Sequence, residues 1–213
     1  TSRPSNSFNG INFSTLNKTN NSRESFIPSN DKFIEIDISA YHPTLASKII
    51  DYKFQEPIYE SFSKLLNIEI SEAKKKFFNV MYGGDFDGLE GIEFFDKIKS
   101  YINKKWMNFN KNGYVECPIS KFRFNKDEHN DMNPFKLFNF ILQNVETSVN
   151  TIILLDIHKI LRNKKTRLVL TVYDSFLFDY DEEEEETINL IKNIFEKYNF
   201  NIKIKEGYNY DFK

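Results

Sequence analysis

Residues 32–39 read Lys-Phe-Ile-Glu-Ile-Asp-Ile-Ser, and residues 168–178 read Leu-Val-Leu-Thr-Val-Tyr-Asp-Ser-Phe-Leu-Phe. The first stretch alternates apolar and polar side chains, which is typical of a half-buried strand. The second is rich in Leu, Val and Phe, which predicts a further strand over residues 167–178. One aspartate ends or interrupts each apolar run, Asp37 in the first and Asp174 in the second. These two predicted strands are the basis for the rest of the interpretation.

The two aspartates are the first candidates for chemistry, because an ionised carboxylate in apolar surroundings is costly unless a cation or an ion pair compensates it. For one aspartate alone, the simpler explanation is a strand end that accepts backbone hydrogen bonds. Two carboxylates on separate strands repel each other unless a divalent metal lies between them. Oxygen ligands favour Mg²⁺ or Mn²⁺, and paired Mg²⁺ ions serve in-line phosphoryl transfer.

A predicted helix over residues 71–81, which Gly83-Gly84 ends, supplies the third candidate feature. Lys74, Phe78 and Tyr82 follow one another at intervals of four residues and so share one helix face. A cation and two aromatic rings in a row could hold a nucleotide, with the lysine on the phosphates. The alternative is an ordinary amphipathic helix with its aromatic rings in the core and its lysine at the edge.

The remaining sequence is mainly helical in pattern, with a second cluster of strand signals towards its end. A mixture of this kind predicts an α+β fold. Helical periodicity occurs over residues 43–50, 58–66, 88–111, 135–161 and 181–198, and a last strand is predicted over residues 201–205.

Composition excludes several classes of protein. The 213 residues include 29 basic and 31 acidic side chains, for a net charge of −2, so a nucleic-acid partner would need a local basic patch. The one cysteine, Cys117, excludes a disulfide framework and an all-thiolate zinc site. No run of eighteen apolar residues is present, so we expect no membrane partner. The single cysteine suits a reducing compartment, and the expected location is the cytoplasm, of a bacterium or of a phage-infected cell.

Taken together, the motifs resemble the DNA polymerase I family (family A), especially its phage members. Residues 22–39 resemble the first palm motif, residues 74–83 the K-x3-F-x3-Y-G fingers helix, and residues 170–175 the third motif, V-H-D-E or V-H-D-S. Further similarities lie in residues 1–5 (T-x-R-x-S), 113–116, 138–143 and 202–207. The resemblance extends over essentially the whole chain.

The resemblance implies an α+β fold in which an antiparallel palm sheet with packed helices carries an inserted helical fingers subdomain. The palm would comprise residues 1–51 and 135–213, and the fingers residues 52–134. The family's thumb and exonuclease domains would be absent from this chain and would belong to the same longer polypeptide or to a companion chain.

The resemblance also implies a role for each matching residue. Asp37 and Asp174 would hold two Mg²⁺ ions, or Mn²⁺ in their place, with the backbone carbonyl of Ile38 as a further ligand. The incoming nucleotide would be bound by His42, Lys74, Phe78 and Tyr82. The DNA would be bound by Arg3, Asn139, Gln143 and Tyr173.

The chain departs from the family pattern at four positions. His42 stands where the first motif has a glutamate that helps to exclude ribonucleotides together with the tyrosine matched by Tyr82; a locally hydrogen-bonded histidine at a helix start is the alternative. Ile70 replaces an arginine that contacts the triphosphate. Tyr173 replaces the histidine of the third motif, and Ser175 replaces its occasional glutamate.

The predicted function is template-directed DNA synthesis, with a template–primer and dNTPs as partners. One alternative is an enzyme similar to single-subunit RNA polymerases, which His42 keeps open. Another is a non-catalytic, DNA-binding remnant of a polymerase, which Ile70 favours and the two retained aspartates oppose. An unrelated metal-dependent nuclease would leave the lysine–tyrosine helix unexplained.

Overall fold

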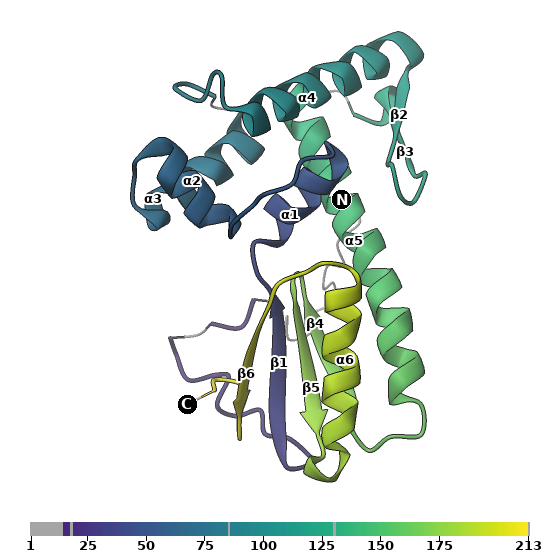
Figure 1. The fold of residues 1–213 in the computed structure, drawn as a ribbon. Coiled ribbons are helices and arrows are strands. Elements are labelled where there is room, and N and C mark those ends of the chain that lie inside the picture. The colour runs from purple at the N-terminus through teal and green to yellow at the C-terminus, as the bar shows by residue number, and fades with distance from the viewer. Residues whose placement is uncertain (1–14, 18, 85, 130, 213) are drawn as a thin grey trace. The chain divides into compact units, whose positions relative to one another are not determined.

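The computed structural model describes residues 15–17, 19–84, 86–129 and 131–212, which form two compact units. The sheet unit comprises residues 15–41 and 150–212, and the helical unit comprises His42–Val149 (Figure 1). The palm and fingers boundaries expected after residues 51 and 134 describe a functional division, which stays a prediction.

The sheet unit is built on a four-stranded antiparallel sheet with the strand order β4-β5-β1-β6. This arrangement, with helices packed on the sheet, confirms the predicted α+β class. The strands are β1 (Lys32–Ile38), β4 (Arg167–Val172), β5 (Ser175–Tyr180) and β6 (Ile202–Gly207).

Alternation along β1 gives the sheet one wholly apolar face and one face on which acidic and apolar residues are mixed. Ile36 lies opposite Phe176 of β5 on the apolar face, and both are fully buried. Helix α6 (Glu185–Lys197), which follows the short helix η4 (Glu182–Glu184), covers this face, and its Phe195 packs edge-on against Phe176 with ring centroids 5.3 Å apart (Figure 1). The opposite face carries Glu35 and Asp37, and next to them a smaller apolar cluster of the buried Phe33, Leu177 and Tyr210.

The single strand predicted over residues 167–178 is wrong, because the chain reverses inside it. β4 ends at Val172, β5 begins at Ser175, and Val172 pairs with Ser175 across a two-residue loop of Tyr173 and Asp174. Tyr173 has φ 55°, in the left-handed region that tight hairpin turns need. Glycine or asparagine usually occupies such a position, so a tyrosine there gives no turn signal and the run looks like one strand.

Most of the helices in the described part of the chain lie in the helical unit. α1 (Tyr41–Ile49) begins at the last residue of the sheet unit, and the end of α5 (Pro134–Leu161), beyond Val149, belongs to that unit. The remaining elements are α2 (Ile58–Leu66), α3 (Ile70–Phe78), the π-helix η2 (Asn79–Gly83), α4 (Glu93–Asn112), β2 (Tyr114–Glu116), β3 (Arg123–Asn125) and η3 (Lys126–Glu128).

Phenylalanines fill the core of the helical unit. The ring of Phe62 in α2 stacks on Phe77 of α3 and on Phe95 of α4, with centroids 5.3 and 5.1 Å apart, and all three side chains are buried. Aromatic pairs of this kind add to the stabilisation that burial alone provides. The core therefore holds α3 in place, and with it the predicted nucleotide-binding face.

Gly84 ends the π-helix in a conformation that excludes a side chain. Its φ is +75°, and a Cβ atom there would lie 2.4 Å from the ring of Phe135. We expect Gly84→Ala to lower the free energy of unfolding by about 2–4 kcal/mol, from left-handed strain and overpacking together. Urea unfolding of the wild type and the variant would measure this difference in the free energy of unfolding.

Two other glycines distinguish the cost of the left-handed conformation from the cost of the clash with Phe135. Gly91 has φ +80° but open space around its Cβ position, so Gly91→Ala should show the conformational cost alone. Gly83 has neither the positive φ nor a close neighbour, so Gly83→Ala should be close to neutral. Equal effects of Gly84→Ala and Gly91→Ala would contradict the predicted clash with Phe135.

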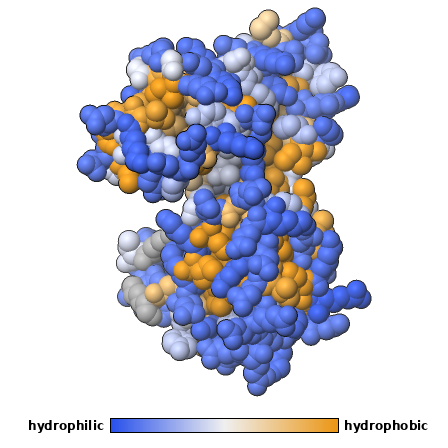
Figure 2. All heavy atoms as spheres, viewed as in Figure 1, coloured by the Kyte–Doolittle hydropathy of each residue, from blue (hydrophilic) through white to orange (hydrophobic). Residues whose placement is uncertain are grey.

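Hydrophilic residues cover most of the visible surface of each unit, with apolar residues in smaller patches (Figure 2). This agrees with a mean hydropathy of −0.53. Among the described residues, no helix combines the length and the apolar character needed to cross a membrane.

Candidate functional site

The sheet unit brings Asp37 and Asp174 next to each other at one end of the sheet. Asp37 lies opposite Ser175, the residue that follows Asp174. The backbone amide of Ile38 donates to the carbonyl oxygen of Asp174 at 2.8 Å. The pairing of β1 with β5 thus places the two aspartates together, although Asp174 lies in the β4–β5 turn rather than within a strand.

The electrostatic environment of Asp37 disfavours its ionised form. Burial is the largest cause that raises its pKa, followed by the charges of Asp174 and Glu35, while Lys205 and Lys203 on β6 act in the opposite direction. A cation at this position would offset the repulsion between the carboxylates. The pair is therefore an acidic site that favours positive charge.

The donors at this site fit a hard divalent cation in kind, since they are carboxylate oxygens. They do not form a large ligand set: no group of three or more His, Cys, Asp or Glu side chains suited to a metal occurs in the part of the chain that the structure describes. Two carboxylates, together with the predicted backbone carbonyl of Ile38, leave further ligand positions for substrate oxygens and water.

Glu35 is a buried residue of this site that the sequence prediction missed. Its Oε1 accepts a hydrogen bond from Ser175 Oγ at 2.9 Å, and Lys205 Nζ lies 3.2 Å from its Oε2. Only 7% of Glu35 is exposed. Glu35 lies two residues before Asp37, so the alternation of β1 places both on one face and could have revealed it. It fixes Ser175 and Lys205 beside Asp37.

A second missed residue, Asn150 on α5, holds the turn that contains Asp174. Its Nδ2 donates to the carbonyl oxygen of Tyr173 at 2.8 Å, and its Oδ1 accepts from the hydroxyl of Tyr41 at 2.7 Å. The side chain of Tyr173, a predicted DNA contact, is 43% exposed beside this turn. The left-handed backbone of Tyr173 is thus stabilised by a side chain distant in sequence.

In the helical unit, the face predicted to bind a nucleotide begins on α3 and continues along the π-helix. The rings of Phe78 and Tyr82 stack with centroids 5.6 Å apart and an interplanar angle of 11°. Lys74 is exposed, and its Nζ lies 5.7 Å from the ring centroid of Tyr59. The predicted helix is confirmed through Phe78, and beyond it the wider π-helix, a form common at functional sites, carries Tyr82.

His42 connects this face to a buried carboxylate. Its Nδ1 is hydrogen-bonded to the hydroxyl of Tyr82, and its Nε2 lies 2.9 Å from Oε2 of Glu146 on α5. His42 and Glu146 are both buried. Glu146 was missed because it lies inside a long apolar helical pattern, where a single acidic residue gives no sign of its partner.

The predicted DNA-binding residues of α5 form a pair, since Gln143 Nε2 donates to Asn139 Oδ1 at 2.9 Å. Both side chains are half-buried. Arg3 lies outside the described residues. The predicted residues therefore fall into two groups, with Asp37, Ile38, Tyr173 and Asp174 in the sheet unit and His42, Lys74, Phe78, Tyr82, Asn139 and Gln143 in the helical unit.

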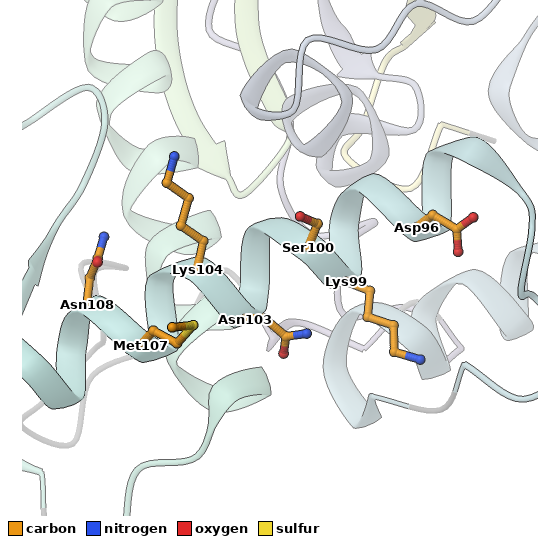
Figure 3. Close-up of a pocket in the computed structure, with 7 residues that line it drawn as sticks. All are labelled: Asp96, Lys99, Ser100, Asn103, Lys104, Met107 and Asn108. Atoms are coloured by element: carbon orange, nitrogen blue, oxygen red, sulfur yellow. The ribbon is translucent and has the colours of Figure 1, made fainter.

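A surface hollow along α4 would be a poor alternative site. It has a volume of about 510 Å³, and its lining comes from α4 alone (Figure 3). Its lining residues are Asp96, Lys99, Ser100, Asn103, Lys104, Met107 and Asn108. None of the predicted site residues lines it, so it plays no part in the proposed chemistry.

The fold is similar to that of a solved polymerase domain. The POL domain of Pol1 from M. smegmatis, in complex with DNA primer-template and dNTP, superposes with a TM-score of 0.71 at 15% sequence identity. The match covers 89% of this chain and 42% of that chain, so this chain spans less than half of the other's length. No family model matches the sequence, and no curated protein does. The likeness establishes a polymerase-type fold.

Proposed function

We propose that the protein is a template-directed DNA polymerase that transfers a nucleotide from a dNTP to the 3′-OH of a primer. The observation that carries this proposal is the pair of adjacent aspartates, Asp37 and Asp174, in a fold similar to a polymerase domain. The exposed Lys74 and the stacked rings of Phe78 and Tyr82 support it.

In this proposal, Asp37 and Asp174 hold two Mg²⁺ ions, with the backbone carbonyl of Ile38 as a further ligand. When bound, the ions would activate the primer 3′-OH and neutralise charge on the triphosphate. The 3′-oxygen attacks the α-phosphate, and pyrophosphate leaves. Asp37 and Asp174 contribute by placing negative oxygen donors where cations are needed, at a site whose own repulsion a cation relieves.

The residues of the helical unit bind and orient the substrates. Lys74 neutralises charge on the phosphates, Phe78 borders the sugar, and Tyr82 lies against the nascent base pair. The proposed DNA contacts are Arg3, Asn139 and Gln143, together with Tyr173 of the sheet unit. Acceptors in the minor groove occur on every base pair, so the α5 amides can test base-pair geometry without reading sequence.

One observation favours a second candidate, an enzyme similar to single-subunit RNA polymerases. His42 occupies the position of the family's sugar-discriminating glutamate and is bound directly to Tyr82. Incorporation of NTPs in preference to dNTPs would identify this alternative.

The test is primer extension with excess template–primer, with dNTPs and NTPs in separate reactions and with Mg²⁺ or EDTA. We expect templated extension with dNTPs that requires Mg²⁺. Template–primer is used in excess so that weak DNA binding does not limit extension. A folded protein that binds template–primer but extends it with neither nucleotide set would instead be the non-catalytic remnant.

A further inference from the structure

Glu146 is a buried carboxylate in the helical unit, with 2% of its surface exposed. Its neighbours on α5, Leu142 and Val145, are apolar and buried. A carboxylate in such surroundings is strongly destabilising unless a partner compensates it. One such partner is His42 Nε2, which lies 2.9 Å from Oε2 of Glu146. Burying the carboxylate of Glu146 costs desolvation free energy, and an apolar side chain would fill the same space without that cost. Packing alone therefore does not explain why a glutamate stands here.

With Glu146 ionised and the ring of His42 neutral, the direction of the hydrogen bonds among the three groups is defined. An ionised carboxylate only accepts, so Nε2 of His42 carries the proton that it donates to Glu146. In the neutral ring Nδ1 is then the acceptor, and the hydroxyl of Tyr82 donates to it. Glu146 therefore determines the tautomer of His42, and through it the hydrogen bond of Tyr82.

The ring of Tyr82 is consequently held in two ways. Its hydroxyl is bound to His42, and its face is stacked on Phe78 with an interplanar angle of 11°. Both nitrogens of the imidazole are engaged, one with Tyr82 and one with Glu146. A sugar hydroxyl that approached this imidazole would lose its hydrogen bonds to water. It could not replace them, because both ring nitrogens of His42 are already hydrogen-bonded.

We infer that Glu146 is a positioning residue for sugar discrimination: by fixing His42 against Tyr82, it makes the binding of a ribonucleotide unfavourable. The inference rests on the proposed function, in which Phe78 and Tyr82 border the incoming nucleotide. Loss of Glu146 frees His42 to turn and to offer a ring nitrogen to a 2′-OH. A purely structural Glu146 would affect stability but would leave the preference between dNTPs and NTPs unchanged.

The test compares variants of nearly equal volume. Glu146→Leu removes the acceptor, whereas Glu146→Gln keeps a carbonyl oxygen that can accept from Nε2. The double variant His42→Glu with Glu146→Leu gives Tyr82 a carboxylate as a direct acceptor. Glu60→Gln, at an exposed position of α2, is the control for the loss of one negative charge.

The readout is the ratio of kcat/KM for dNTP to that for NTP, with a thermal melt of each variant. We expect Glu146→Leu to lower the ratio by about tenfold, as expected for one lost buried hydrogen bond, mainly through a lower KM for NTP. For Glu146→Gln and Glu60→Gln this ratio should stay within about threefold of wild type, and the double variant should have a higher ratio than Glu146→Leu. A folded Glu146→Leu protein with an unchanged ratio would overturn the inference.

A measurement on the wild-type protein keeps the test independent of how the variants fold. In ¹⁵N-histidine NMR at pH 8, His42 should carry its proton on Nε2, and a ring protonated only on Nδ1 would overturn the inference. Wild-type protein that extends with neither nucleotide would refute the proposed function and the role in discrimination with it. Normal extension with an unchanged ratio in folded Glu146→Leu would refute the role of Glu146 alone.

Discussion

Asp37→Asn is expected to reduce primer extension by about a thousandfold or more. The substitution keeps the size of the side chain but removes one of the two carboxylates that would hold the metal ions, and effects of this order follow the loss of a group that stabilises transition-state charge. Single-turnover extension with saturating dNTP and template–primer would measure it. The exposed Glu186→Gln of α6 should retain wild-type activity and controls for the change in net charge.

The same substitution is expected to stabilise the protein at neutral pH. The pKa of Asp37 is raised in the folded state by burial and by Asp174, so the folded protein binds this proton more tightly than the unfolded chain does. Wild-type stability should therefore fall as the pH rises from the unfolded pKa through the raised folded value. Asp37→Asn removes that loss, and above the raised pKa its thermal midpoint should exceed that of wild type.

Two results would contradict this interpretation of Asp37. One is Asp37→Asn protein that retains extension close to wild type, which would remove the carboxylate from the chemistry. The other is a lower thermal midpoint for Asp37→Asn at neutral pH, which would show that the ionised carboxylate stabilises the fold. Added Mg²⁺ should raise the midpoint of wild type and have a smaller effect on Asp37→Asn.

Lys74→Ala should lower kcat/KM for dNTP by about fiftyfold, because it removes a positive charge that is proposed to contact the phosphates. Most of the effect should appear as a higher KM, since Lys74 is exposed and its loss leaves the core intact. The measurement is single-nucleotide insertion over a range of dNTP concentrations.

Lys75→Ala is the matched control, because Lys75 is also exposed and lies one residue further along α3, on another face. It should leave KM within about twofold of wild type. Equal effects of the two substitutions would point to general electrostatic attraction of DNA rather than a contact made by Lys74.

The parts of the fold that the sequence predicts are those in which a local pattern is repeated. The alternation in β1 and the helical spacing of α5 extend over many residues, and both elements are confirmed. The β4–β5 turn was missed because its left-handed residue is Tyr173, which Asn150 holds by a hydrogen bond from a distant part of the chain. The residues around the turn do not indicate a hydrogen bond from a residue so distant in sequence.

In the candidate site, too, residues that belong to a local sequence pattern could be predicted, and contacts between distant residues could not. Asp37 and Asp174 stand out because a charge interrupts an apolar run, and Lys74, Phe78 and Tyr82 because of their spacing. The pairing of His42 with Glu146 joins residues 104 positions apart, so no local pattern contains it. Glu35 is the intermediate case, since its place on the face of Asp37 follows from alternation but its bond to Ser175 does not.

Strand β6 has a consequence for the solubility of the protein. It is one edge of the sheet, and the exposed Ile204 on it is flanked by Lys203 and Lys205. Lysines on an open edge discourage pairing with the edge of another molecule. The same two lysines offset part of the rise in the pKa of Asp37 that burial, Asp174 and Glu35 cause. Neutralising them would therefore promote aggregation as well as altering the acidity of the site, and the resulting loss of material could be mistaken for a loss of activity.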